Sequence, residues 1–592
     1  MSVIDQRVKK LREKMQENSI DAYIVPTSDP HMSEYNAKHY EARHFISGFT
    51  GSAGTALVTR DKAYLWTDGR YFIQAEKQLK DSEFELMKLN TANYPTLLEY
   101  LNEHLDKGAT VAVNGEVLSQ AQAEKYQESL AKKDISLELD HKLVSEIWEE
   151  QPALPKEKIF LLDEKWTGRS LEDKLKSMRK AMSENDEDYN LIGSLDDIAW
   201  LYNYRGNDIL YTPVAYAYTL VSQDEAILFI DLDKVAEEVR KTLEADGVTL
   251  KDYTDIFEVI SSLKNVSLRL DKSVINSLVY SYIDDSVEVI NKKDWTLLEK
   301  AIKNDTEIKN QYEAYRKDGL AITRLIYWLK HEDVNKLSEL DVSRKSLELR
   351  QELDTFLELS FTTIAAYEAN AAMAHYAPTK DDYADLKDKG FILVDSGGQY
   401  YEGTTDTTRT IAIGPLSDEE IHDYTLTLKA HINLARAVFL KGATGYQLDM
   451  LARAPMWREH VDFKHGTGHG IGYLLNVHEG PQSINTSKYN LNPMLPGMIT
   501  SNEPGVYKEG KHGVRLESVV VCVEDGKVGS DEFLRFETMT RVPLEREAID
   551  KSLLTEEEIA WVNDYHQACY ESHKDYLSTE EAAWLKDVCR PL

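Results

Sequence analysis

Apolar residues recur every three or four positions in the first segment of the chain, MSVIDQRVKKLREKMQ, as on one face of an α-helix. The residues of this face are Ile4, Val8, Leu11 and Met15. The segment lacks the continuous apolar run of a secretion signal, so we interpret it as a folded first helix. Residues 23–29 have the pattern of a strand and a turn, and 52–71 that of a hairpin leading into a helix.

The hairpin pattern occurs twice in the chain. ALVTRDKAYLWTD at Ala56–Asp68 aligns without gaps with TLVSQDEAILFID at Thr219–Asp231, and six positions are identical. Each copy follows an apolar run that ends in a turn with serine and aspartate, at 23–29 and 191–197. A chance match is the alternative for so short a window, but the shared order of flanking elements favours duplication. The sequence therefore predicts two successive domains with one α/β fold.

Breaks in the pattern suggest where the domains end. Pro152 and Pro155 interrupt a charged stretch, where neither a helix nor a central strand continues easily. Near residues 300–310 a long amphipathic helix begins, whose apolar face includes Ile322, Leu325, Ile326 and Leu329. We expect α/β domains at 1–155 and 156–305 and a catalytic domain of mixed α/β and α+β type at 306–542.

The last segment, 543–592, has the pattern of a helical tail. Capping-box sequences at Thr555–Glu558 and Ser578–Glu581 each precede apolar positions, which predicts two helices. The tail contains no residues suggestive of chemistry, so we expect it to serve packing or oligomer formation.

Composition excludes several classes of function. The chain has 592 residues, is 42% hydrophobic and carries a net charge of −33. Such an acidic protein lacks the concentrated lysine and arginine that nucleic acids or anionic membranes need. No apolar run approaches the roughly 18 residues of a membrane span. Three widely spaced cysteines, Cys522, Cys569 and Cys589, fit a reducing compartment, so we expect a cytoplasmic protein.

Two aspartates of the last third lie around a glycine-rich return. In FILVDSGGQYYEGTTDTTRTIAIG an apolar run ends on Asp395, and a threonine-rich run begins with Asp406. A hairpin here brings the two carboxylates side by side, which is unfavourable unless a cation or a shared proton lies between them. Either aspartate alone would be interpreted as a turn residue.

Three more candidate ligands follow in order. His469 lies in KHGTGHGIG, where the glycines argue against a helix and favour an open, irregular loop that approaches a ligand. Glu503 ends a strand-like run before Pro504, and Glu517 lies in GVRLESVVVCV on the same predicted strand face as Arg515. A carboxylate facing the core needs a partner, either a metal ion or Arg515, which could also orient it.

One histidine and four carboxylates form an oxygen-rich set. Such a set suits manganese, magnesium, cobalt or zinc in a two-metal site better than a thiolate zinc site. The reaction class that it indicates is metal-assisted hydrolysis.

These motifs resemble those of the pita-bread metallopeptidases, and among them the long, three-domain Xaa-Pro aminopeptidases. The resemblance rests on HGTGHGIG, NVHEGP, NEPGVY and GVRLES, and on SGFTGSAGTALV, WTDGRYF and SLDDIAWLYNYRG, and it extends over essentially the whole chain. It departs at Asn502, where many relatives have an acidic residue. The resemblance implies two creatinase-like domains, a pita-bread catalytic domain and cleavage of the bond before a proline at the second position of a peptide.

The resemblance also implies roles for individual residues. Asp406 and Glu517 would bridge two divalent metal ions, Asp395 would bind one of them, and His469 and Glu503 the other. A hydroxide between the metals would attack the scissile carbonyl, since coordination lowers the pKa of water to about 7. The remaining residues that it places at the catalytic or substrate site, besides Glu503, are His375, His465, His478 and Arg515. We expect manganese in both positions, with zinc or cobalt as alternatives.

Related activities and assemblies follow from the same family. A prolidase or a methionine aminopeptidase would share the ligands, but these resemble shorter chains without the duplicated domain. A metal-free partner-binding or creatine-hydrolysing relative would have lost ligands that are all present here. The family implies a homodimer, with Trp457 as a candidate contact and a buried tryptophan as the simpler alternative. A flat apolar surface for proline is implied near His375 and Tyr376.

Overall fold

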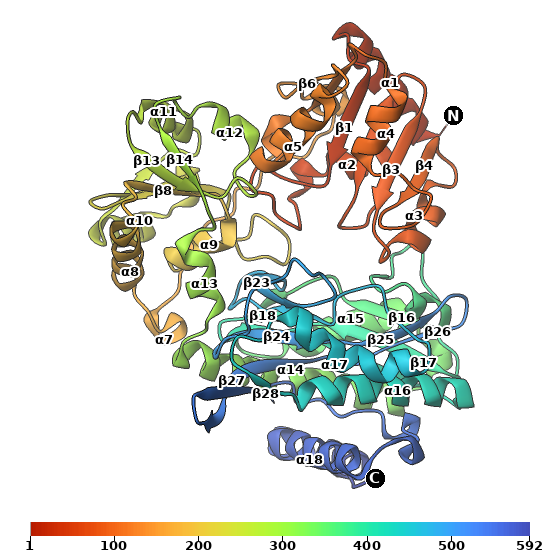
Figure 1. The fold of residues 1–592 in the computed structure, drawn as a ribbon. Coiled ribbons are helices and arrows are strands. Elements are labelled where there is room, and N and C mark those ends of the chain that lie inside the picture. Colours follow the sequence, from red (N-terminus) through yellow and green to blue (C-terminus); the bar gives the residue numbers. More distant parts are fainter. Residues whose placement is uncertain (1) are drawn as a thin grey trace. The chain divides into compact units, whose positions relative to one another are not determined.

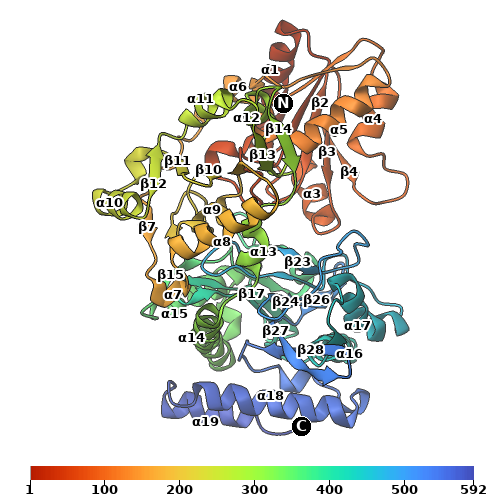
Figure 2. The same cartoon turned by 60° about the vertical axis from the view of Figure 1, so that its left-hand side comes forward.

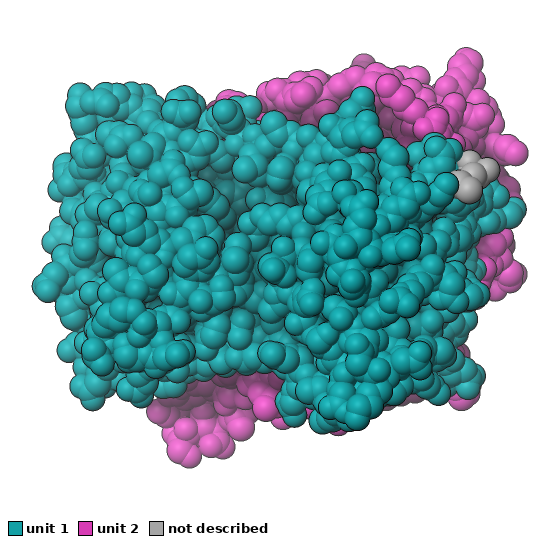
Figure 3. Space-filling model, turned by 90° about the horizontal axis from the view of Figure 1, so that it is seen from above, with its two compact units in different colours: residues 1–163, 169–297 teal, residues 164–168, 298–592 magenta. Residues whose placement is uncertain are grey.

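Both copies of the repeated segment fold into an antiparallel pair of strands. The first copy forms β2 (Thr55–Thr59) and β3 (Ala63–Thr67), and the second forms β10 (Ala217–Ser222) and β11 (Ala226–Ile230). The structure is a computed structural model that describes residues 2–592. It divides into unit 1, residues 1–163 and 169–297, and unit 2, residues 164–168 and 298–592; Figure 3 colours the two units separately.

The two sheets of unit 1 have the same strand order and the same strand directions. The first runs β4 (Phe84–Lys88), β3, β2, β1 (Ala22–Pro26), β5 (Thr110–Val113), β6 (Ser136–Glu138). The second runs β12 (Val248–Lys251), β11, β10, β8 (Tyr189–Ile192), β13 (Ser267–Leu270), β14 (Glu288–Asn291). In each sheet the central three strands pair antiparallel and the outer pairings are parallel. The predicted duplication is confirmed.

Helices cover both faces of the first sheet, because successive side chains of each strand point to opposite faces and both sets are apolar. Tyr23 and Val25 of β1 pack with α1 and α3, whereas Ala22 and Ile24 pack on the other side with α4 and α5. The helices of unit 1 are α1 (Val3–Glu17), α2 (Ala42–Ser47), α3 (Phe72–Leu79), α4 (Leu97–His104), α5 (Gln120–Ala131), α6 (Leu143–Ile147), α8 (Leu171–Glu184), α9 (Leu195–Leu201), α10 (Glu237–Ala245), α11 (Asp255–Ser262) and α12 (Ser277–Ser281). Val8, Leu11 and Met15 are buried along α1, which confirms the predicted first helix.

The predicted domain limits fall in different kinds of segment. Pro152 and Pro155 lie in a stretch without helix or strand between α6 and β7 (Phe160–Leu161), which pairs with β9 (Tyr204–Arg205). Near the second predicted limit, α13 (Trp295–Ala301) spans the end of unit 1 and the start of unit 2. Because unit 1 contains both repeated sheets, the division at residue 155 stays a prediction, as do the other proposed limits.

Unit 2 contains the candidate site and is built from helices packed on sheets (Figure 1). The first sheet is β16 (Ile364–Tyr367), β17 (Phe391–Ser396), β20 (Thr407–Ala412). Its apolar face packs against α14 (Asp305–His331) and α15 (Glu339–Gln351). The predicted long amphipathic helix is therefore confirmed, with Ile322, Leu325, Ile326 and Leu329 buried.

A larger sheet forms the other half of unit 2. Its order is β21 (Val438–Leu440), β28 (Asp531–Thr538), β27 (Ser518–Val528), β24 (Ile499–Asn502), β22 (Gly468–Gly470), β23 (Glu479–Ile484). The helices α16 (Asp418–Ala435) and α17 (Gly445–Arg458) pack on it. Smaller pairings are β15 (Phe356–Leu359), β18 (Gly398–Tyr400), β19 (Gly403–Thr404), and the hairpin β25 (Gly505–Lys508), β26 (His512–Arg515).

The tail consists of the two predicted helices, α18 (Glu556–His573) and α19 (Thr579–Val588) (Figure 2). Each helix begins with a complete capping box. Val562, Tyr565 and Leu585 of the tail pack with Phe391 and Tyr424, so the tail belongs to the core of unit 2. The three cysteines are buried free thiols. Among residues 2–592, no helix combines the length and the apolar character that crossing a membrane requires.

Candidate metal centre

The five predicted ligands lie at strand ends or in short strands of unit 2. Asp395 is near the end of β17, which pairs with β20 so that Asp395 faces Thr408, and Asp406 directly precedes β20. His469 is the middle residue of β22, and Glu503 directly follows β24. Glu517 lies between β26 and β27.

The fold brings all five side chains together. Asp395, Asp406 and Glu517 form one group whose donor atoms lie within 4.8 Å of one another, and His469, Glu503 and Glu517 form a second. A third group joins Asp406 and His469 to His478. Because the groups share members, the five predicted ligands and His478 form one cluster.

His469 is oriented with one ring nitrogen toward the carboxylates. Its Nε2 lies 3.4 Å from Asp406 Oδ2 and 3.4 Å from Glu503 Oε1. Its Nδ1 lies 2.9 Å from the carbonyl oxygen of Gly470, which only accepts, so Nδ1 carries a hydrogen and Nε2 is the atom that would bind a cation in place of a proton. Enclosure by itself would lower the pKa of His469, but Asp406 and Glu503 raise it to about 9.

The carboxylates carry more negative charge than the surrounding protein compensates. Burial raises the pKa of Asp395, with Asp406 adding to the shift and Arg515 opposing it. Burial and the carboxylates of Asp406 and Glu503 raise the pKa of Glu517 well above its usual range. Asp395 Oδ1 and Glu517 Oε1 are buried and accept no hydrogen bond from the described residues. Oxygen donors that converge in this way fit hard divalent cations.

Arg515 pairs with Asp395. The alternative from the sequence, in which Arg515 pairs with Glu517, is therefore wrong. Arg515 Nη2 donates to Asp395 Oδ2 at 2.6 Å and its Nε to Thr408 Oγ1 at 3.2 Å. The reason is a break in the predicted strand, because Leu516 and Glu517 separate β26 from β27 and the two strands join different sheets. Thr408 Oγ1 donates instead to Glu517 Oε2 at 2.9 Å.

A chain of hydrogen bonds leads from Asp395 to His465. Arg515 Nη1 donates to the Tyr507 hydroxyl at 2.8 Å, and this hydroxyl lies 2.8 Å from His465 Nε2. His465 Nδ1 lies 2.7 Å from the carbonyl oxygen of Gly466, so Nδ1 carries the hydrogen and Tyr507 donates to Nε2. The site therefore holds His465 in one orientation.

The other two predicted histidines differ in position. The ring of His478 meets that of His469 edge to face, with centroids 4.3 Å apart. His375 is half-buried in the segment after the short helix η5 (Glu368–Ala372) and is not a member of the donor groups. Its neighbour Tyr376 is buried in a small apolar core, and its hydroxyl donates to Glu339 Oε2 at 2.8 Å. Tyr376 is therefore itself buried, and the apolar surface for proline implied near His375 and Tyr376 stays a prediction.

Three residues of the site had no expectation from the sequence. Thr408 is two positions from Asp406, so strand alternation could have placed both on one face. Ser501 Oγ donates to Glu503 Oε1 at 3.0 Å and accepts from the His469 backbone N–H at 2.9 Å. Tyr507 ends the NEPGVY motif, but the motif indicated no role for it, and its contacts with His465 and Arg515 are seen only in the fold. The predicted loop around His469 is instead a short strand, because glycines on both sides allow close pairing with β24 and β23.

Comparison with known sequences gives matches over nearly the whole chain. Residues 7–141 and 150–307 each match the Creatinase/Prolidase N-terminal domain. Residues 310–524 match metallopeptidase family M24, and 532–592 match the C-terminal region of peptidase M24. A probable Xaa-Pro aminopeptidase P of Laccaria bicolor is 40% identical over 607 aligned residues, covering 99% of this chain and 93% of the relative.

Solved structures agree with the sequence matches. The X-prolyl aminopeptidase of Caenorhabditis elegans, described as a cytosolic enzyme with a di-nuclear active site, is 33% identical with a TM-score of 0.95. The match covers 100% of both chains. A prolidase of Thermococcus sibiricus is 20% identical with a TM-score of 0.51 and covers 64% of this chain and 98% of its own, so it supports the fold alone.

Proposed function

Because the chain belongs to metallopeptidase family M24, we propose that it is an Xaa-Pro aminopeptidase, which removes an N-terminal residue that precedes proline. The observation that carries the proposal is the cluster of His469 with four carboxylates in unit 2. The full-length relative at 40% identity is named for this activity, whereas the prolidase resembles only part of the chain.

We propose that two divalent cations bind in the cluster. Asp395, Asp406 and Glu517 would hold one, and His469 and Glu503 would hold the other together with Asp406 and Glu517 as bridges. Membership of Asp406 and Glu517 in two donor groups each supports this assignment. When bound, the cations supply Lewis acidity and lower the pKa of a water molecule, which provides the nucleophile. We propose manganese in both positions, with zinc or cobalt as alternatives.

The surrounding side chains orient the ligands and the peptide. Arg515 fixes Asp395 through a charge-assisted hydrogen bond, and Thr408 fixes Glu517. His478, at the edge of His469, is suited to donate to the peptide carbonyl oxygen as negative charge develops there. Peptide contacts for His375, His465 and Arg515 remain part of the proposal. In the structure Arg515 is buried and donates to Asp395, which favours an orienting role for it.

A pair of peptides tests the activity directly. The enzyme should remove arginine from Arg-Pro-Pro much faster than from Arg-Ala-Pro, because an X–Pro bond is a tertiary amide that demands its own pocket. Both peptides should be assayed after metal removal by a chelator and after addition of Mn²⁺, Zn²⁺ or Co²⁺. Equal rates for the two peptides would contradict the proline preference, and full activity in chelator would contradict the metal centre.

The assembly and the location are further parts of the proposal. We propose a homodimer formed through α17, where Tyr446, Met450 and Trp457 lie on one exposed stripe. Trp457 is 43% exposed, so the simpler alternative of a buried tryptophan is wrong. We also propose a cytoplasmic location, as described for the Caenorhabditis elegans relative.

A further inference from the structure

The hairpin β25–β26 has two faces with different partners. Tyr507 pairs with Gly513 across the hairpin, and with Arg515 this pair faces the metal centre. Lys508 pairs with His512 on the opposite face, because successive residues of a strand alternate. On this outer face Val514 packs with Tyr424 and Leu428 of α16. One small element therefore connects helix α16 to the site.

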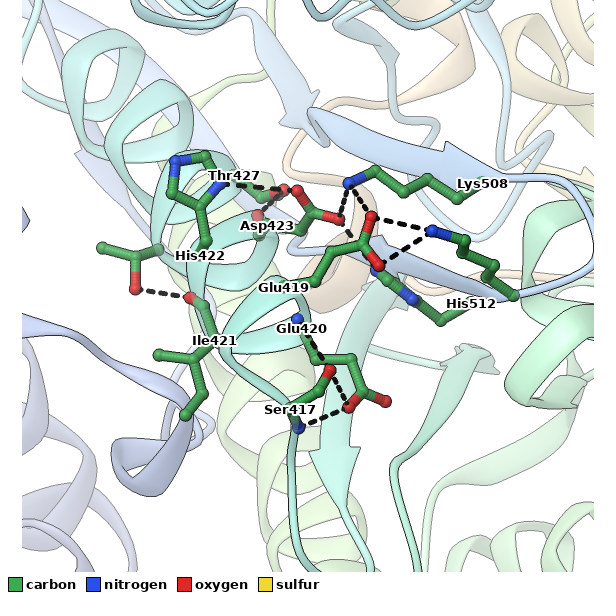
Figure 4. Close-up of polar contacts among 11 residues, drawn as sticks. Ser417, Glu419, Glu420, Ile421, His422, Asp423, Thr427, Lys508 and His512 are labelled. Carbon is green, nitrogen blue, oxygen red and sulfur yellow. Dashed lines mark hydrogen bonds and ion pairs between the residues drawn. The ribbon is translucent and has the colours of Figure 1, made fainter.

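The outer face is fastened by a single buried carboxylate. Asp423 of α16 is 1% exposed, and its Oδ2 lies 2.8 Å from His512 Nε2 and 2.7 Å from Lys508 Nζ (Figure 4). His422 Nδ1 lies 3.6 Å from Asp423 Oδ1. Asp423 thus contacts one residue from each strand of the hairpin, directly across the register from each other.

A second acidic residue of α16 contributes at the surface. Glu419 is bonded to Lys508 at 2.9 Å (Figure 4). It is also bonded to Lys511 at 2.9 Å. These exposed pairs are weak because solvent screens them. The buried carboxylate is different, since removal of one partner from a buried, hydrogen-bonded charge cluster is strongly unfavourable.

The inner face of the hairpin also packs closely against its neighbour, η5. A Cβ at Gly513 would lie 1.9 Å from the carbonyl oxygen of Ala371 in η5, the helix that leads to His375. Apolar contacts of Val506 and Val514 do not define a direction, whereas the bonds of Asp423 do. A tilt of the hairpin would move Tyr507 away from His465 and Arg515 away from Asp395.

We propose that Asp423 is a positioning residue for peptide hydrolysis, which holds the hairpin so that Tyr507 and Arg515 keep His465 and Asp395 in place. This inference rests on the proposed function. It adds a residue that lies on a helix outside the cluster and has no hydrogen bond or ion pair with the five ligands or with His465.

The first part of the test uses three variants of the full chain. Asp423→Asn removes the charge but keeps the shape, and Lys508→Met removes the half-exposed partner with little risk to folding. The control is Lys429→Met on the same helix, because Lys429 bonds to Glu558 and to the Leu553 carbonyl of the tail and not to the hairpin. Metal content per chain and thermal unfolding are measured for each.

Hydrogen exchange reports on the hairpin without any substrate. Amides of residues 505–515 should exchange faster in Asp423→Asn than in the wild type, and Lys429→Met should leave them unchanged. Unchanged exchange in both Asp423→Asn and Lys508→Met overturns the proposal. A wild type that fails on Arg-Pro-Pro would instead overturn the proposed function, and the exchange result would still stand.

Kinetics test whether Asp423 affects turnover through the hairpin β25–β26. We expect kcat to fall on the order of tenfold in Asp423→Asn with KM little changed and metal retained, because small misplacements of site groups are costly. Combined with Tyr507→Phe, the loss should be smaller than the product of the two single losses. A full product, or a loss equal to that of Lys429→Met, overturns the proposal. Should Asp423→Asn fail to fold, Lys508→Met is subjected to the same cycle.

Discussion

The side chains of the cluster differ in the number of donor groups to which they belong. Asp406 belongs to two donor groups, one with Asp395 and Glu517 and one with His469 and His478. His478 belongs to one group and contacts His469 through its ring edge. We therefore propose Asp406 as a ligand of both cations, whereas we propose that His478 contacts the peptide.

Two alanine variants distinguish these assignments. Asp406→Ala should abolish turnover and reduce bound metal well below two equivalents, since a bridging carboxylate serves both ions. His478→Ala should lower kcat by roughly 10²–10³-fold with metal retained, as for the loss of a donor to the developing oxyanion. Elemental analysis and turnover are measured on both. Metal loss in His478→Ala would make it a ligand, and unchanged metal in Asp406→Ala would remove it from the centre.

His431 of α16 is buried with neither ring nitrogen bonded to the described residues. Burial, with a contribution from Arg409, lowers its pKa to about 3. A histidine with a depressed folded pKa binds its proton only on unfolding, so stability is unaffected at pH 7 and is lost as pH falls below about 6.5.

Replacing His431 by leucine should therefore flatten the acid side of the stability curve. Between pH 7 and pH 5, the free energy of unfolding should fall by about 2 kcal/mol more in the wild type than in the variant. The reason is that over roughly 1.5 pH units below 6.5 the unfolded chain binds a proton at His431 that the folded chain does not. Urea unfolding at both pH values measures the difference. Parallel curves for the two proteins would show that His431 is protonated in the folded state.

At the level of elements, the tail helices are defined by their first turns. The Thr555 hydroxyl accepts a hydrogen bond from the backbone N–H of Glu558 at 3.2 Å, and the Glu558 carboxylate accepts one from the backbone N–H of Thr555 at 2.8 Å. Thr555→Ala should lower the free energy of unfolding by about 1 kcal/mol, and Thr555→Ser, which keeps the hydroxyl, by much less. Chemical denaturation of both measures this. Equal losses would show that packing of the methyl group, and not the cap, is responsible.

Local patterns were sufficient for these elements because their cause lies within a few residues. The apolar spacing of α1, the paired hairpins and the two capping boxes all follow from neighbours in sequence. The break between β26 and β27 did not follow, since the apolar alternation continues through Leu516 while the pairing partners change. The site showed the same limit. Its five candidate ligands could be predicted from motifs, but Thr408, Tyr507 and Asp423 acquire their roles from partners that only the fold brings near.

For the whole molecule, the exposed stripe of α17 predicts its assembly. Trp457→Glu introduces a charge into this surface, and Trp457→Phe keeps it apolar. Light scattering should give twice the chain mass for the wild type and the phenylalanine variant, and the mass of one chain for the glutamate variant. A wild type that scatters as one chain, or a glutamate variant that stays paired, would contradict a homodimer through α17.

The order of the ligands along the chain has a consequence for biosynthesis. The first ligand is at position 395 and the last at position 517, in the gap before β27. Domains fold largely in order as a ribosome releases them, so both repeated sheets can form while the cluster still lacks Glu517. All five proposed ligands are therefore present only once the chain extends to Glu517, well after the repeated sheets have been synthesised.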